Sequence, residues 1–191
     1  METTLQKLLR LAKESEQELI NMGFREQVES VKKVYTIAKA KRRLGQCVEK
    51  KYINISKWLL EVGSDKEIKE TIIHEILHTF HDTVGHGTVW QRYARLVSDY
   101  GVYNITRTAN IQDIMQNNGV DKDKEKDLLG YKYEITCKKC GSVYYKRRIE
   151  KRTIQSYKSG YRVHTSCGGN CFKVRDLKTD EILVDGIRKV L

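Results

Sequence analysis

Apolar side chains recur at helical spacing in three stretches of the chain. In residues 1–20 the leucines, an alanine and an isoleucine fall on one face of a helix, and residues 65–82 and 88–100 repeat this pattern. A shorter run at 58–62 directly precedes the second of these stretches. The pattern predicts three amphipathic helices and one short helix in the first hundred residues.

Two runs between the first and second long helices have the composition of strands. Residues 34–40 are rich in β-branched and aromatic side chains, and residues 51–56 alternate apolar and polar side chains. Residues 117–127 are polar and highly charged, which predicts a surface linker. Tyrosines, basic residues and cysteines then replace the helical pattern, so we expect a second module after the linker.

The helix predicted over residues 65–82 carries the sequence His-Glu-Ile-Leu-His, from His74 to His78. Residues four apart lie side by side on a helix, so both imidazoles can reach one zinc ion at about 2.0–2.1 Å. Glu75 lies on the flank of that face. There its carboxylate can act as general base on water whose pKa zinc lowers toward about 7. The spacing predicts a catalytic zinc held by His74 and His78, with Glu75 as the base.

A catalytic zinc needs a third protein ligand and an open fourth position. His86 is preferred, because it lies between two glycines where a tight turn can bring the chain back to the metal. His81 is the alternative, since it lies on the same helix face one turn further on. Tyr93 and Tyr100 on the next helix are candidates for contacts to an oxyanion.

The composition indicates an extensive polar surface. Hydrophobic residues make up 39% of the 191 residues and charged residues 32%. The N-terminus has no apolar core suited to secretion, and no apolar run approaches the length of a membrane span. We therefore expect a cytoplasmic or nucleoid-associated protein without a membrane partner.

The cysteines of the second half have the spacing of a structural zinc site. Cys137 and Cys140 form a C-x-x-C knuckle followed by glycine, which in a reducing compartment favours metal over disulfide. Cys167 supplies a third ligand. The fourth is either His164, whose spacing to Cys167 mirrors the first knuckle, or Cys171, which gives an all-cysteine site. Four ligands close the coordination shell, so this second zinc is expected to be structural.

Positive charge is concentrated in the same module. Residues 131–178 contain 13 lysines and arginines against 3 acidic residues, a large share of the net charge of +11. Cations that bind phosphate alternate here with aromatic rings that can stack on bases, which predicts DNA binding. The cations are Lys146, Arg147, Arg148, Lys151 and Arg152, and the rings are Tyr144, Tyr145, Tyr157 and Tyr161.

The chain resembles the SprT-like zinc metalloproteases over residues 15–175. The likeness is carried by HEILHTFHDTVGHGTVW and, further on, by CKKCGSVYYKRRI and YRVHTSCGGNC. Together with the predicted elements it implies an α+β chain. A mainly helical, zincin-like metalloprotease domain with a small β-sheet is expected over residues 1–120, and a β-rich zinc ribbon over residues 128–191.

The resemblance also implies roles for residues. It makes His74, His78 and His86 the catalytic zinc ligands and Glu75 the base, and it implies proteolysis of DNA-bound proteins. The chain departs from the family in its second knuckle, where His164 stands at a position that is usually cysteine in bacterial relatives.

Three functions are compatible with these features. The first is a zinc-dependent endopeptidase that acts on DNA-associated proteins through a nucleic-acid-binding ribbon. The second is a DNA-binding regulator whose peptidase-like domain is not catalytic, which the presence of Glu75 disfavours because a structural site needs no base. The third is a metalloprotease that cleaves one specific repressor and uses the ribbon for protein docking.

Overall fold

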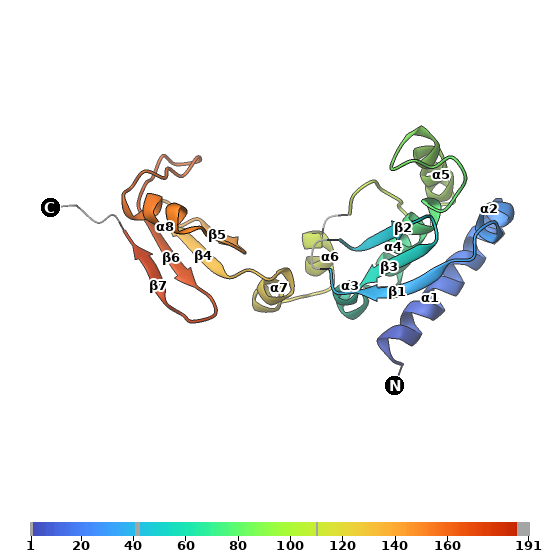
Figure 1. Ribbon diagram of the computed structural model, residues 1–191, viewed down its shortest axis with the longest axis horizontal. Coiled ribbons are helices and arrows are strands. Elements are labelled where there is room, and N and C mark those ends of the chain that lie inside the picture. The colour runs from blue at the N-terminus through green and yellow to red at the C-terminus, as the bar shows by residue number, and fades with distance from the viewer. Residues whose placement is uncertain (1, 41–42, 110, 187–191) are drawn as a thin grey trace. The chain divides into compact units, whose positions relative to one another are not determined.

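The computed structural model describes residues 2–40, 43–109 and 111–186. Residue 1 of the first predicted helix and residues 187–191 of the predicted ribbon lie outside the described residues. The chain divides into two compact units, Met1–Glu125 and Lys126–Leu191 (Figure 1). Each unit contains helices and a small sheet, which confirms the expected α+β class.

The first unit is mainly helical. Its elements in chain order are α1 (Thr4–Leu19), the π-helical turn η1 (Ile20–Phe24), α2 (Arg25–Glu29), β1 (Val34–Ala38), β2 (Gly45–Val48), β3 (Tyr52–Ser56), α3 (Lys57–Val62), α4 (Asp65–Leu77), α5 (Thr88–Asp99) and α6 (Ile111–Asn117). Helix α7 (Lys122–Leu129) spans the boundary between the units. Within the described residues, no helix combines the length and the apolar run needed to cross a membrane.

The sheet of the first unit has the strand order β1-β3-β2. β1 runs parallel to β3, and β2 pairs with β3 in the antiparallel direction, opposing Gly45 to Ile55 and Cys47 to Ile53. Ile53 and Ile55 are fully buried. Because α4 packs against β2 and β3 and also against α1 and α5, it is the central helix of this unit (Figure 1).

Helix α4 begins where local hydrogen bonds satisfy its first amides. The Ser64 hydroxyl accepts from the Glu67 amide at 3.3 Å, and the Glu67 carboxylate accepts from the Ser64 amide at 2.9 Å. This capping box stabilises the first turn. One side of the helix is completely buried and anchors it in the core, through Ile68, Ile72, Ile73, Ile76 and Leu77.

The same helix ends earlier than its periodicity predicts. Its last residue is Leu77, with His78 as C-cap, whereas the apolar pattern indicated an end at residue 82. The Thr83 hydroxyl donates to the carbonyls of His78 at 3.1 Å and of Phe80 at 2.8 Å, and Asp82 has a left-handed φ of 60°. These bonds satisfy the carbonyl of the C-cap and one carbonyl of the turn that follows, where the chain leaves the helix axis.

Two other differences concern elements that the sequence pattern did not predict. Strand β2 has only four residues and begins with a glycine, which is too short for a clear alternation. The stretch 117–127 is only partly a linker, because α7 begins within it at Lys122. The Asp121 carboxylate accepts from the amides of Asp123 and Lys124, both at 2.9 Å, and so caps this charged helix.

The second unit is built on an antiparallel sheet with the strand order β5-β4-β6-β7. Its elements are β4 (Tyr133–Cys137), β5 (Val143–Lys146), α8 (Lys151–Lys158), β6 (Phe172–Asp176) and β7 (Ile182–Asp185). The buried core is small and consists of Ile135, Cys137, Tyr157, Phe172, Val174 and Val184. A core of this size stabilises a module of some 60 residues only weakly, and a bound metal would add to that stability.

Candidate metal centres and active site

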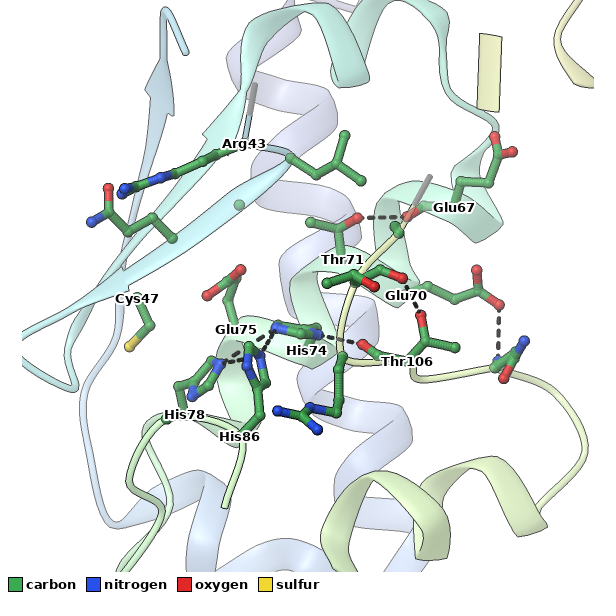
Figure 2. A pocket seen from close by; sticks show the side chains of 18 of the residues that line it. Arg43, Cys47, Glu67, Glu70, Thr71, His74, Glu75, His78, His86 and Thr106 are labelled. Carbon is green, nitrogen blue, oxygen red and sulfur yellow. Dashed lines mark hydrogen bonds between the residues drawn. The ribbon is translucent and has the colours of Figure 1, made fainter. Parts of the chain in front are cut away.

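Three histidine side chains of the first unit meet at one point (Figure 2). The Nε2 atom of His78 lies 3.3 Å from the Nε2 atoms of both His74 and His86, and those two atoms are 2.9 Å apart. His74 comes from α4, His78 from its C-cap, and His86 from the loop that leads into α5. The early end of α4 lets the chain return and bring His86 to the other two histidines.

The geometry of these three atoms fits a zinc ion. Zn–N bonds of about 2.0–2.1 Å at tetrahedral angles separate two nitrogens by about 3.3–3.4 Å, which is close to the observed spacing. The Nδ1–H of His74 donates to the carbonyl of Thr106 at 2.9 Å, so its Nε2 carries the free lone pair. Burial lowers the pKa of both His74 and His78 to about 4, which keeps them in the neutral form that binds metal.

Trp90 forms the floor beneath the three imidazoles. Its side chain is 1% exposed, and its ring centroid lies 4.7 Å from that of His74, 5.5 Å from that of His78 and 4.5 Å from that of His86. A single rigid ring that contacts all three side chains restricts their rotamers. The apolar periodicity of α5 placed Trp90 in the core but gave no sign of this second role.

The alternative candidates lie away from this point. His81 is 93% exposed in its side chain and pairs with Asp82 at 2.7 Å, so the structure does not bring it to the other histidines. Tyr93 packs against Phe24 and Phe80, and the Tyr100 hydroxyl donates to the Met22 carbonyl at 2.8 Å. Neither tyrosine lines the cavity that contains the histidines.

The Glu75 carboxylate lies beside the histidines in a restricted space. Its residue is 6% exposed, and burial raises its pKa to about 7 while a backbone hydrogen bond from Cys47 opposes that rise. Gly45 of β2 approaches it closely, since a Cβ atom there would lie 2.7 Å from both Cγ and Oε1 of Glu75. Strand β2 therefore holds the carboxylate in place and leaves no room for a larger residue at position 45.

The histidines and Glu75 line a cavity of about 970 Å³. From the histidines the cavity extends along α4 past Thr71 to Glu67 (Figure 2). Helix α6 contributes Asp113 to its wall. Strand β2 forms another side and, among the described strands, is at the edge of its sheet. The space is large enough for several side chains of an extended peptide.

The second unit brings four further ligands together. Cys137, Cys140, His164 and Cys167 place their ligand atoms within 4.8 Å of one another. The Nδ1 atom of His164 lies 3.1 Å from the sulfur of Cys167 and 3.5 Å from that of Cys140, and the sulfurs of Cys137 and Cys167 are 3.6 Å apart. Cys171 is not part of this group.

The chemistry of this second group fits a closed zinc site. Three thiolates and one imidazole form a common structural zinc shell. Hydrogen bonds from the side chain and backbone of Ser142 lower the pKa of Cys140 to about 6, which favours the thiolate that a metal requires. The amide of Gly169 donates to the Cys167 sulfur at 3.3 Å, which lowers the pKa of this thiol, whereas burial and the nearby sulfurs of Cys140 and Cys137 raise it, and the net shift is upward. In the part of the chain that the structure describes, the histidine group and this group are the two candidate metal centres.

The five cations that were predicted to bind phosphate differ in their exposure and in their contacts. The Arg147 Nε donates to the Leu129 carbonyl at 2.5 Å, and its guanidinium lies 5.5 Å from the centre of the Tyr131 ring, so this side chain supports the fold. Lys146 is half-buried. Of the five cations predicted to bind phosphate, Arg148, Lys151 and Arg152 are exposed, the last two on α8.

The tyrosine rings that were expected to stack on bases also differ in their exposure. Tyr157 is 1% exposed, and its hydroxyl lies 2.8 Å from that of Tyr144, which is packed against the same core. Tyr157 is therefore a core residue, and its prediction as a ring that stacks on bases was wrong. Tyr161 is 88% exposed and remains available for such a contact. The sequence showed only that cations and tyrosines alternate. It could not show that Tyr157 faces the core, because this residue lies on α8, and the buried face of a helix recurs every 3.6 residues.

Two contributors to the site were missed by the sequence analysis. Gly45 begins a strand that is too short to be predicted, although an isolated glycine in a strand often marks a close approach of another group. Thr106 acts through its backbone carbonyl, which carries no sequence signal. Both become visible only once the chain has folded over α4.

Comparison with known proteins agrees with this geometry. A model of the SprT-like family matches residues 10–109, which include every residue of the histidine site and the glutamate beside it. No curated protein and no solved structure matches the chain. The matched segment covers more than half of the sequence, and the chain is therefore a member of the SprT-like family.

Proposed function

We propose that this protein is a zinc-dependent endopeptidase that acts on proteins associated with DNA. One observation carries the proposal: a buried carboxylate, Glu75, lies beside three converging imidazoles in a cavity bordered by the edge strand β2. A purely structural metal site needs neither the carboxylate nor the open space. Membership of the SprT-like family supports the same reading.

The roles of the residues follow from their positions. His74, His78 and His86 would hold the zinc, which in such a site lowers the pKa of water and polarises a carbonyl. Glu75 accepts a proton from the attacking water and delivers it to the nitrogen of the departing amine. Burial raises the pKa of the Glu75 carboxyl above its ordinary value, which favours uptake of a proton from water.

Strand β2 supports a peptide as the substrate. An edge strand presents backbone amides and carbonyls that an extended peptide can pair with as an added strand. β2 contributes Gly45, Gln46 and Cys47 to the cavity wall, so a peptide paired there would run past Glu75. The peptide backbone would supply affinity, and the cavity along α4 would accept side chains.

The proposed DNA contact rests on the second unit. Arg148, Lys151 and Arg152 are exposed cations, and Tyr161 is an exposed ring in the same module. Cations of this kind bind phosphates with an affinity that falls as salt is raised, and an exposed ring can stack on a base. DNA binding by this unit would direct the peptidase unit to proteins that share the same DNA.

The proposal is tested by a cleavage assay on a basic DNA-binding protein. The zinc-loaded protein is incubated with this substrate alone, with single-stranded DNA and with double-stranded DNA, and fragments are followed on gels. Cleavage that DNA accelerates and a chelator abolishes supports the full proposal. Cleavage without any effect of DNA contradicts the DNA part and favours protein docking by the ribbon. If the protein binds zinc but cleaves neither this substrate nor an unfolded protein, the peptidase part of the proposal is contradicted.

A further inference from the structure

The segment of residues 103–106, which follows α5, is fixed to α4 at two points one helical turn apart. The amide of Asn104 donates to the Glu70 Oε1 atom at 3.0 Å, and the Thr106 carbonyl accepts from His74 Nδ1 at 2.9 Å. Glu70 and His74 are four residues apart on α4 and therefore share one face (Figure 2). We call residues 103–106 the strap.

The strap has further anchors that do not involve α4. Ile105 is 7% exposed, and its amide donates to the Ser98 Oγ atom at 3.0 Å. The Tyr103 hydroxyl donates to the Glu18 carboxylate. These contacts hold the strap close to the core even without Glu70. The hydrogen bond that the Asn104 amide donates to Glu70 holds the backbone between Asn104 and Thr106 at this level of α4.

The placement of the Thr106 carbonyl matters because it orients a metal ligand. A hydrogen bond from the remote ring nitrogen fixes both the tautomer and the ring plane of a ligating histidine, and losing such a bond lowers metal affinity. We propose that Glu70 is a positioning residue for His74, acting through the backbone of Asn104, Ile105 and Thr106. This inference rests on the zinc site proposed above.

Glu70 also lines the cavity, so its charge alone is a competing explanation. A carboxylate near a cation site raises cation affinity without any contact to the strap. Two variants separate the explanations. Glu70→Gln removes the charge and keeps an oxygen that can accept from Asn104, whereas Glu70→Ala removes both. Asp113→Asn is the matched control, because Asp113 is an exposed carboxylate on the wall of the same cavity.

The experiment measures cobalt and zinc binding to the full chain. Co²⁺ bound by the cysteines of the second unit would absorb strongly in the visible, so this site is first filled with one equivalent of Zn²⁺, and the visible bands of added Co²⁺ then report on the histidine site. Zn²⁺ affinity is then obtained by competition with Co²⁺ and a chromophoric chelator. The melting temperature of each metal-free variant is measured as a control for folding.

We expect Glu70→Ala to weaken Zn²⁺ binding at the histidine site by about fivefold, less than the 10–100-fold typical of a direct partner of a ligand. The visible Co²⁺ bands at this site should shift as well. Glu70→Gln and Asp113→Asn should stay within about twofold of the wild type. Unchanged affinity in Glu70→Ala overturns the inference, and so does equal weakening in Glu70→Gln, which would assign the effect to charge.

If Glu70→Ala fails to fold, Glu70→Asp decides, because its carboxylate is one methylene too short to reach the Asn104 amide. It should weaken binding as Ala would, although it keeps the charge, and wild-type affinity in this variant overturns the inference. Absence of Co²⁺ and Zn²⁺ binding at the histidine site of the wild type contradicts the proposed function itself.

Discussion

Replacing Gly45 with alanine tests whether the position of the Glu75 carboxylate decides activity. The new Cβ would lie 2.7 Å from both Cγ and Oε1 of Glu75 and 3.0 Å from its Cδ. Ordinary contacts between carbon atoms need about 3.5–4.0 Å, so the carboxylate must move by about 1 Å. These atoms are the far end of a flexible side chain, and the fold should tolerate the change.

A displacement of about 1 Å at a reacting group can lower the rate by about 100-fold. We therefore expect Gly45→Ala to lower kcat/KM for peptide cleavage by about 10- to 100-fold, while zinc content and Tm stay near the wild-type values. Val48→Ala is the control, because Val48 lies on the same strand with its side chain on the opposite face. Wild-type kcat/KM in a zinc-loaded Gly45→Ala protein would refute the argument that β2 sets the position of Glu75.

Three further predictions concern the second unit. A strong chelator should unfold residues 126–191 and leave the first unit folded, which limited proteolysis and circular dichroism would detect; a protease-resistant second unit without metal would contradict a structural zinc. Cys167→Ser should lose one zinc per chain whereas Cys171→Ser should keep both, as measured by metal analysis, and loss in both variants would restore Cys171 as a ligand. Charge reversal of Arg148 and Arg152 together should weaken DNA binding by at least about tenfold at 100 mM salt. The slope of log affinity against log salt concentration should fall by the equivalent of about two phosphate contacts. Unchanged affinity would show that the ribbon does not contact DNA through these residues.

The histidine site could be predicted because its chemistry is mostly local in sequence. His74 and Glu75 lie in the last turn of α4 and His78 is its C-cap, so helix geometry alone fixes their relation. His86 was reached by a weaker argument, that two flanking glycines permit a return of the chain. The physical cause of that return, the Thr83 hydroxyl bonding to the carbonyls of His78 and Phe80, could not be read from periodicity.

The parts that escaped prediction depend on contacts between distant segments. Strand β2 exists because it pairs with β3, and Gly45 matters because β2 crosses α4 at Glu75. Thr106 contributes through its backbone, which is identical in every residue type. In the second unit the choice between His164 and Cys171 could not be made from spacing, since both spacings are compatible with zinc. The folded chain brings His164 to the other three ligands.

The most direct test of the proposed function compares the wild type with Glu75→Gln at equal metal content. Glutamine is nearly isosteric with glutamate but cannot accept the proton from water. We expect Glu75→Gln to bind as much zinc as the wild type, to bind DNA with the same affinity, and to lose cleavage of a DNA-bound substrate by at least about 100-fold. Cleavage by zinc-loaded Glu75→Gln at the wild-type rate would contradict the assignment of this chain as a peptidase that uses Glu75.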